Sequence, residues 1–164
     1  MKNIVLIGMP GTGKSTVGVL LAKSLLMDFC DTDLIIQKQF SSPLCDIIAD
    51  IGTDGFIKAE DEILAGINLE NTVIATGGSA VYGENAMKNL KENGIAVYLD
   101  TPLDELQKRL LNIHTRGVAM KKGTTLKDLF NEREPLYKQY ADITVSCINI
   151  TPEECVEKIV KLIK

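Results

Sequence analysis

The sequence predicts an α/β domain in which a parallel sheet carries helices on both faces. Short runs of β-branched and aliphatic residues alternate along the chain with segments whose apolar residues recur at helical spacing. Hydrophobic residues make up 45% of the chain but aromatic residues only 5%, and such aliphatic cores suit buried parallel strands. A length of 164 residues, without a linker or an internal repeat, fits one domain spanning 1–164.

The opening of the chain predicts a strand, a glycine loop and a helix. Ile4 to Ile7 is a short apolar run that ends at Gly8, which indicates a buried strand. Apolar residues at helical spacing then predict a helix over 14–26. A second strand over 27–31 and the start of another helix over 34–40 continue the alternation.

The middle of the chain predicts two helices and a third strand. The helices span 44–51 and 56–67, because Gly52-Thr53-Asp54-Gly55 interrupts the helical pattern. The strand spans 72–75 and leads into Gly77-Gly78-Ser79.

The remaining elements follow from their start and stop signals. Asn93-Gly94 is a helix stop, Pro102 favours a first helical turn, and Thr151 begins a capping-box sequence. The predicted elements are a helix over 86–91, a strand over 95–99, a helix over 102–111, a mobile loop over 114–125, helices over 126–133 and 136–140, a strand over 143–147 and a helix from 151 onward.

Composition and charge exclude several classes of function. A formal net charge of -4 argues against a nucleic-acid surface, and Lys121-Lys122 reads as solvated loop charge. The four cysteines form no C-x-x-C pair and only one His is present, so a zinc site is not expected and the thiols should be reduced. The apolar run from Met1 to Gly8 is too short for a secretory signal or a membrane span. We therefore expect a cytoplasmic protein with no membrane or nucleic-acid partner.

The strongest motif is the sequence from Gly8 to Ser15, which matches G-x-x-x-x-G-K-[ST] in full. Its glycines let main-chain N–H groups surround phosphate oxygens at the start of a helix. Lys14 would contact the β- and γ-phosphates, and the Ser15 hydroxyl would coordinate Mg²⁺. The alternative is a strand-to-helix turn without a ligand. The residues expected to bind the nucleotide here are Gly11, Thr12, Gly13, Lys14, Ser15 and Thr16.

Three further clusters follow this P-loop: Asp31-Thr32-Asp33, Gly77-Gly78-Ser79-Ala80 and Arg133 to Tyr137. In this order and spacing the four motifs resemble the shikimate kinase family, small relatives of the nucleoside monophosphate kinases, over essentially the whole chain. The resemblance implies a three-layer α/β/α P-loop NTPase fold with a five-stranded parallel sheet of order 2-3-1-4-5. It also implies a monomer that uses ATP and Mg²⁺, a mobile lid at about 112–125 and an acceptor-binding helical region at about 33–67.

The resemblance assigns roles on the acceptor side of the site. Asp33 would orient the acceptor hydroxyl and take its proton, whereas the alternative is a helix N-cap. Asp31 would lie near the Mg²⁺ ion. Gly77, Gly78 and Ser79 would contact the acceptor, unless they form a simple turn.

Three arginines and one loop complete the expected site. Arg116 would be a lid arginine that stabilises the transferring phosphoryl group. Arg133 would hold the carboxylate of the acceptor by bidentate hydrogen bonds, the alternative being a surface ion pair with Glu132 or Glu134. Arg109 would stack near adenine, and Pro152 belongs to the loop expected on the adenine side.

The acceptor side departs from the family pattern at three places. Ile57 stands where the family has a second arginine for the substrate carboxylate, Ser79 replaces a third glycine, and the lid sequence from Arg116 to Met120 is altered. A lost charge-assisted hydrogen bond is worth about 1.5–3 kcal/mol, or roughly ten- to a hundredfold in affinity. Two candidate acceptors therefore remain: shikimate, bound with lower affinity, or a carboxylate-free cyclic polyol or sugar.

Together these observations predict an ATP-dependent kinase of a small hydroxylated molecule. A nucleotide-binding protein without turnover is the alternative from another class, and a transfer assay would distinguish the two. A GTPase is set aside because the chain has no N-K-x-D sequence to read guanine.

Overall fold

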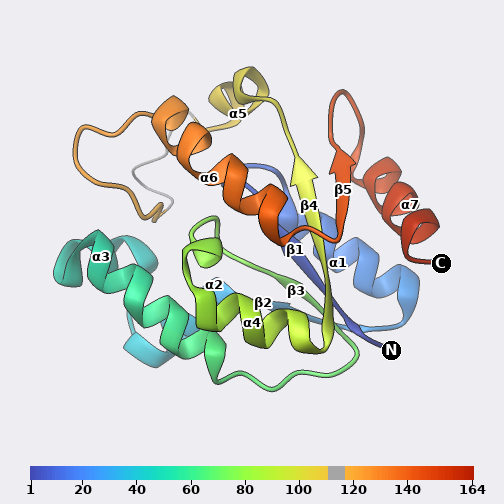
Figure 1. Ribbon diagram of the computed structural model, residues 1–164, viewed down its shortest axis with the longest axis horizontal. Coiled ribbons are helices and arrows are strands. Elements are labelled where there is room, and N and C mark those ends of the chain that lie inside the picture. The colour runs from blue at the N-terminus through green and yellow to red at the C-terminus, as the bar shows by residue number, and fades with distance from the viewer. Residues whose placement is uncertain (111–116) are drawn as a thin grey trace.

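The fold is built on a central sheet of five parallel strands. The computed structural model of the chain describes residues 1–110 and 117–164. Its strand order is β2-β3-β1-β4-β5, so the predicted fold class and strand order are confirmed (Figure 1). The strands are β1 (Asn3–Ile7), β2 (Asp28–Asp31), β3 (Thr72–Ala75), β4 (Gly94–Asp100) and β5 (Ile143–Ser146).

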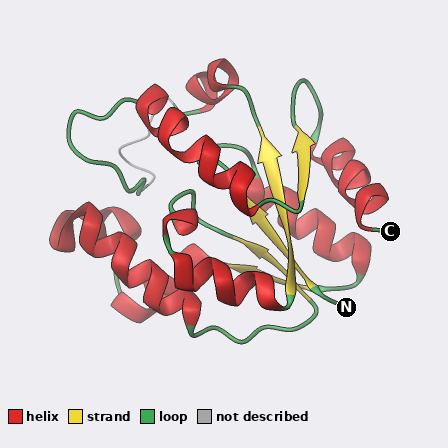
Figure 2. Cartoon of the chain, viewed as in Figure 1, coloured by secondary structure: helices red, strands yellow, loops and turns green. Residues whose placement is uncertain are grey.

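Helices cover both faces of this sheet, as Figure 2 shows. Strand β1 is fully buried and its side chains alternate between two hydrophobic layers. Ile4 and Leu6 pack in the layer that contains α1 and α7, whereas Val5 and Ile7 pack in the layer that contains α4 and α6. The helices are α1 (Lys14–Leu25), α2 (Thr32–Phe40), α3 (Leu44–Ala65), α4 (Glu84–Glu92), α5 (Leu103–Arg109), α6 (Leu126–Tyr140) and α7 (Pro152–Ile163), with a short 3₁₀ helix η1 (Ala80–Tyr82).

Of the two helix pairs that the sequence predicted, one is interrupted by a kink, as expected, and the other proves to be a single helix. The break expected over Gly52 to Gly55 is confined to Gly52, the one residue of α3 with non-helical backbone angles (φ 78°, ψ 169°). Thr53 to Gly55 are helical, because a single glycine is enough to make the turn. By contrast, α6 continues through Pro135, where the sequence predicted a gap between two helices.

The ends of the later elements follow their sequence signals closely. Thr151 caps α7 and exchanges hydrogen bonds with Glu154 in a capping box, as predicted. Helix α5 is shorter than expected, since Pro102 precedes it as the N-cap and Leu110 follows it as the C-cap. Within the described ranges, no helix is both long and apolar enough to cross a bilayer.

Candidate active site

The phosphate loop joins the carboxyl end of β1 to the start of α1. Gly11 and Gly13 adopt positive φ angles of 86° and 88°, a conformation that side chains rarely tolerate. A Cβ at Gly11 would lie 2.9 Å from the Leu110 side chain, so glycine is also required by space. Gly13 is the N-cap residue of α1, which leaves the first N–H groups of the helix available to an anion.

Lys14 is the cation of this loop. Its Nζ donates hydrogen bonds of 2.8 Å to the carbonyl oxygens of Gly8 and Met9, so the ammonium is held at the loop. Burial lowers the pKa of Lys14 to about 8, although the carboxylates of Asp33 and Asp31 oppose the shift. A negatively charged ligand would therefore stabilise the ammonium form of Lys14.

Ser15 and Asp31, the two residues expected near a Mg²⁺ ion, lie side by side. The Ser15 hydroxyl donates to Asp31 Oδ2 at 2.7 Å, and Asp31 Oδ1 accepts the main-chain N–H of Asp33 at 3.0 Å. The described residues contain no cluster of three or more metal-binding side chains. A hydroxyl and one carboxylate nevertheless fit Mg²⁺, which commonly binds one or two carboxylates together with substrate phosphates and water. Asp31 is the N-cap of α2, so the alternative role considered for Asp33 is excluded.

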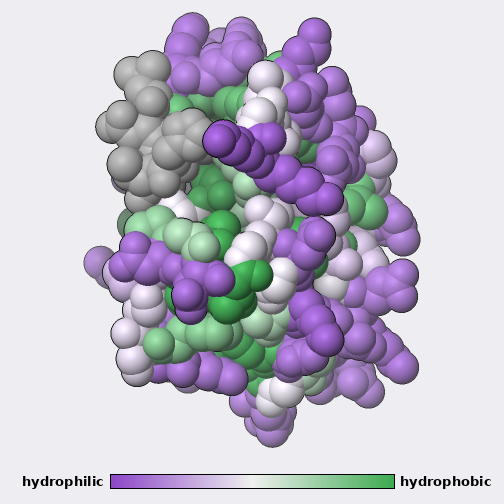
Figure 3. Space-filling model, turned by 90° about the vertical axis from the view of Figure 1, so that its left-hand side faces the viewer, coloured by the Kyte–Doolittle hydropathy of each residue, from purple (hydrophilic) through white to green (hydrophobic). Residues whose placement is uncertain are grey.

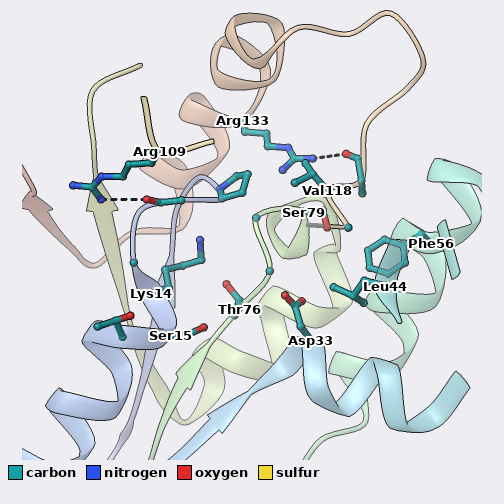
Figure 4. A pocket seen from close by; sticks show the side chains of 18 residues that line it. Lys14, Ser15, Asp33, Leu44, Phe56, Thr76, Ser79, Arg109, Val118 and Arg133 are labelled. Atoms are coloured by element: carbon teal, nitrogen blue, oxygen red, sulfur yellow. Dashed lines mark hydrogen bonds between the residues drawn. The ribbon is translucent and has the colours of Figure 1, made fainter. Parts of the chain in front are cut away.

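Asp33 points into the cavity from the first turn of α2 (Figure 4). Burial and, to a lesser degree, the nearby Asp31 carboxylate raise the pKa of Asp33 to about 6, although Lys14 opposes both effects. A carboxylate with this pKa is ionised at pH 7 and more basic than an ordinary Asp. It is therefore suited to accept a proton from a hydroxyl.

Arg133 on α6 is buried, with 1% of its surface exposed. Its Nη2 donates to the carbonyl oxygen of Ala119 at 2.6 Å, its Nε donates to the Tyr82 hydroxyl at 3.2 Å, and the guanidinium stacks over the Tyr82 ring. Glu132 accepts from Tyr82 and Glu134 pairs with Lys138, so neither forms the surface ion pair considered as an alternative. Arg133 is thus a fixed cation on the cavity wall.

The glycine turn after β3 is packed tightly between these charged groups. A Cβ at Gly77 would lie 2.8 Å from Asp33 Oδ1, and a Cβ at Gly78 would lie 3.0 Å from Arg133 Nη1. The glycines therefore do more than turn the chain, because side chains at these positions would displace Asp33 or Arg133. Ser79 follows them, lines the cavity and donates a hydrogen bond to Glu60 at 2.6 Å.

Other predicted residues lie farther from the centre or outside the described chain. Arg109 lines the cavity, donates to the Gly11 carbonyl oxygen and forms an ion pair with Glu105. Thr12 is buried within the loop, and Pro152 begins α7 without lining the cavity. Arg116 lies in the segment 111–116, outside the described residues, and so does part of the predicted lid.

The structure places Phe56, not Ile57, on the cavity wall, together with Leu44. The bend at Gly52 brings these two residues from separate halves of α3 to one apolar side of the cavity. Val118 and Ala119, from the described part of the predicted lid, also line it. The sequence analysis did not assign Leu44 or Phe56 to the site, since nothing in their local pattern separates a cavity wall from a core.

Glu60 is the charged residue that the sequence analysis missed. It is 1% exposed, and burial raises its pKa to about 7, although the hydrogen bond from Ser79 opposes the shift. In the sequence it stands among other acidic residues of a helix, which usually face solvent. A spacing of four residues from both Phe56 and Leu64 was the one available signal that it faces inward.

These residues surround one cavity of about 690 Å³ at the carboxyl ends of the strands. In Figure 4 the phosphate loop lies on one side, Leu44 and Phe56 lie on the other, and Asp33 and Arg133 face the space between them. The face of the molecule on the side of α3 carries apolar surface in its middle and hydrophilic side chains around it (Figure 3). The arrangement can hold a polyphosphate beside a small ring with polar substituents.

Comparison with known proteins agrees with this geometry. The family model for shikimate kinase matches residues 10–164. The chain belongs to the shikimate kinase family. It is 38% identical to a shikimate kinase of Thermodesulfovibrio yellowstonii over 164 residues, which cover 98% of this chain and 94% of that protein.

Two further proteins are similar to the chain. The chain is 36% identical to threonine synthase-like 1 of Homo sapiens over 166 residues, and the match spans 99% of the chain but only 22% of that longer protein. Among solved structures, shikimate kinase from Acinetobacter baumannii in complex with shikimate superposes with a TM-score of 0.89 and 32% identity. That match covers 99% of this chain and 93% of the other.

Proposed function

We propose that the chain is a kinase that transfers the γ-phosphoryl group of ATP to a hydroxyl of a small hydroxylated ring acid, with shikimate as the leading acceptor and shikimate 3-phosphate as the product. The observation that carries the proposal is the single cavity shared by Lys14, Asp33 and Arg133. Membership of the shikimate kinase family and the likeness to a structure that holds shikimate support the choice of acceptor.

The residues divide the reaction between them. Lys14 and the N–H groups of the loop bind the phosphates, and Arg133 holds the carboxylate of the acceptor. Asp33 accepts the proton of the acceptor hydroxyl as its oxygen forms a bond to the γ-phosphorus and the bond to the departing ADP breaks. Mg²⁺ beside Ser15 and Asp31 would neutralise phosphate charge. Arg116 would add a cation from the lid, a role that remains a prediction.

A carboxylate-free cyclic polyol or sugar is the second candidate acceptor. It is favoured by the cavity lining, in which Arg133 is the single cation at the acceptor end among the described residues. Ile57 supplies no charge there, and Lys58 beside it is exposed. With one guanidinium in place of two, the affinity for an acceptor with a carboxylate would be about ten- to a hundredfold weaker.

The setting we propose is a monomer in the cytoplasm. The four cysteines are all free thiols, as expected in a reducing compartment. Sedimentation of the purified protein would test the monomer, and a dimer would contradict it.

Two substitutions test the roles assigned to Lys14 and Asp33. Lys14→Ala should abolish ADP release in the presence of ATP, Mg²⁺ and shikimate, because the phosphates lose their buried cation.

Asp33→Asn should lower turnover by about two to four orders of magnitude with little change in nucleotide affinity, since the base is lost. The matched controls Lys23→Ala on α1 and Asp28→Asn on β2, both at exposed positions, should behave like wild type.

The outcomes separate the candidates. Near-normal turnover by Asp33→Asn would mean that another group takes the proton. Transfer to a cyclic polyol but not to shikimate would favour the second candidate. Nucleotide binding without transfer to any acceptor would favour a protein that has lost turnover.

A further inference from the structure

Glu60 is a carboxylate enclosed by protein at the acceptor end of the cavity. Its Oε1 accepts the Ser79 hydroxyl at 2.6 Å, while its Oε2 is buried and has no hydrogen-bond partner among the described residues. An unpaired buried oxygen of this kind destabilises a fold, so the position is not explained by stability. A role in binding would account for it.

The charged groups that face Glu60 come from three helices. Asp33 on α2 and Asp61 on α3 disfavour its ionised form, whereas Arg133 on α6 favours it. The position of a Cβ at Gly77 lies 3.1 Å from Glu60 Oε2 and 2.8 Å from Asp33 Oδ1, so the two carboxylates approach each other across Gly77. Glu60 therefore belongs to the same cluster of charged residues as the proposed base Asp33, although Glu60 does not line the cavity itself.

Ser79 connects Glu60 to the cavity. A hydroxyl group carries one proton and two lone pairs. Because Ser79 donates its proton to Glu60, it can offer only lone pairs to a ligand in the cavity. A ligand hydroxyl or amine can donate to those lone pairs, but a carboxylate oxygen is an acceptor and meets them unfavourably.

We propose that the Glu60–Ser79 pair determines acceptor specificity: it favours a hydrogen-bond donor, such as a hydroxyl, against Ser79 and disfavours a carboxylate there. The proposal rests on the proposed kinase function and refines its choice of acceptor. Ser79 is the residue that touches the acceptor, and Glu60 is a positioning residue that fixes the direction of the Ser79 hydroxyl. The pair thus opposes the advantage that Arg133 gives to a carboxylate.

The test compares two acceptors that differ in one group: shikimate, and its analogue with a hydroxymethyl group in place of the carboxylate. The measured quantity is the ratio of kcat/KM for the acid to kcat/KM for the alcohol, at pH 8, where Glu60 is ionised. Glu60→Gln should raise this ratio by about ten- to a hundredfold, because Gln can donate to Ser79 and release the Ser79 proton toward the ligand. Glu62→Gln, an equal change of charge at an exposed position of α3, should leave it unchanged.

A double-mutant cycle shows whether the effect passes through Ser79. In a Ser79→Ala background, Glu60→Gln should change the ratio by less than about twofold. An unchanged ratio in Glu60→Gln, or an equal rise in the Ser79→Ala background, would overturn the proposal. Calorimetry with the same two ligands gives the ratio as dissociation constants. It tests the pair even if no phosphoryl group is transferred, a result that would count against the proposed kinase function alone.

Discussion

Among single residues, Lys14 gives the clearest expectation for nucleotide binding. Its ammonium is buried and its pKa is lowered to about 8, so at higher pH the free protein loses the charge that should contact the phosphates. Between pH 7 and pH 9 we expect nucleotide affinity to fall by about tenfold, since the neutral amine must regain a proton to bind. Calorimetry with a non-hydrolysable ATP analogue in excess Mg²⁺ measures this directly.

The control for this expectation is Lys14→Met, which removes the titrating group. Its affinity should be weaker than that of the wild type but constant over the same pH range. A wild-type affinity that does not change from pH 7 to pH 9 would show that Lys14 keeps its charge, or that it does not contact the nucleotide.

Which residues could be identified from the sequence depended on whether their role is local. Lys14 and Ser15 belong to a contiguous motif whose backbone geometry sets their position, and Asp33 and Arg133 lie in clusters that the family resemblance marks. Glu60 could not be identified, because it matters only through Ser79, Asp33 and Arg133, which come from other elements. The sequence analysis also placed Ile57 in the acceptor site, whereas the helix turns Phe56 toward the cavity.

Among the elements, α3 owes its shape to Gly52. The backbone there (φ 78°, ψ 169°) lies in a region open essentially to glycine alone. Gly52→Ala should therefore lower the free energy of unfolding by about 1–3 kcal/mol, although a Cβ would meet no atom within 4 Å. Urea denaturation with an unchanged m value would measure the difference.

Gly66→Ala provides the comparison, because Gly66 has ordinary right-handed angles (φ -98°, ψ -6°) at the end of the same helix. We expect its stability to equal or slightly exceed that of the wild type. If Gly52→Ala were as stable as Gly66→Ala, the bend in α3 would not require glycine. The sequence showed that a break was needed near Gly52 but could not show that one residue suffices, because backbone angles depend on the packing of both halves.

For the whole molecule, the sheet topology brings the residues of the site together. The motifs are spread from Gly8 to Arg133, yet parallel strands bring their carboxyl ends to one edge of the sheet, where the cavity lies. Strand and helix alternation and the aliphatic composition were enough to predict the α/β class. The strand order came from the family resemblance. The detailed acceptor side could not be predicted, because it combines α2, α3, α6 and the turn after β3.

The most direct test of the central claim, that this edge of the sheet is a site of phosphoryl transfer, is acceptor-dependent release of ADP. Purified protein would be given ATP and Mg²⁺, with and without shikimate or a cyclic polyol, at pH 8. Our account predicts that one of these acceptors raises ADP release well above the background without acceptor, and that Asp33→Asn removes the increase. ADP release that no acceptor raises, from folded protein that binds the nucleotide, would contradict it.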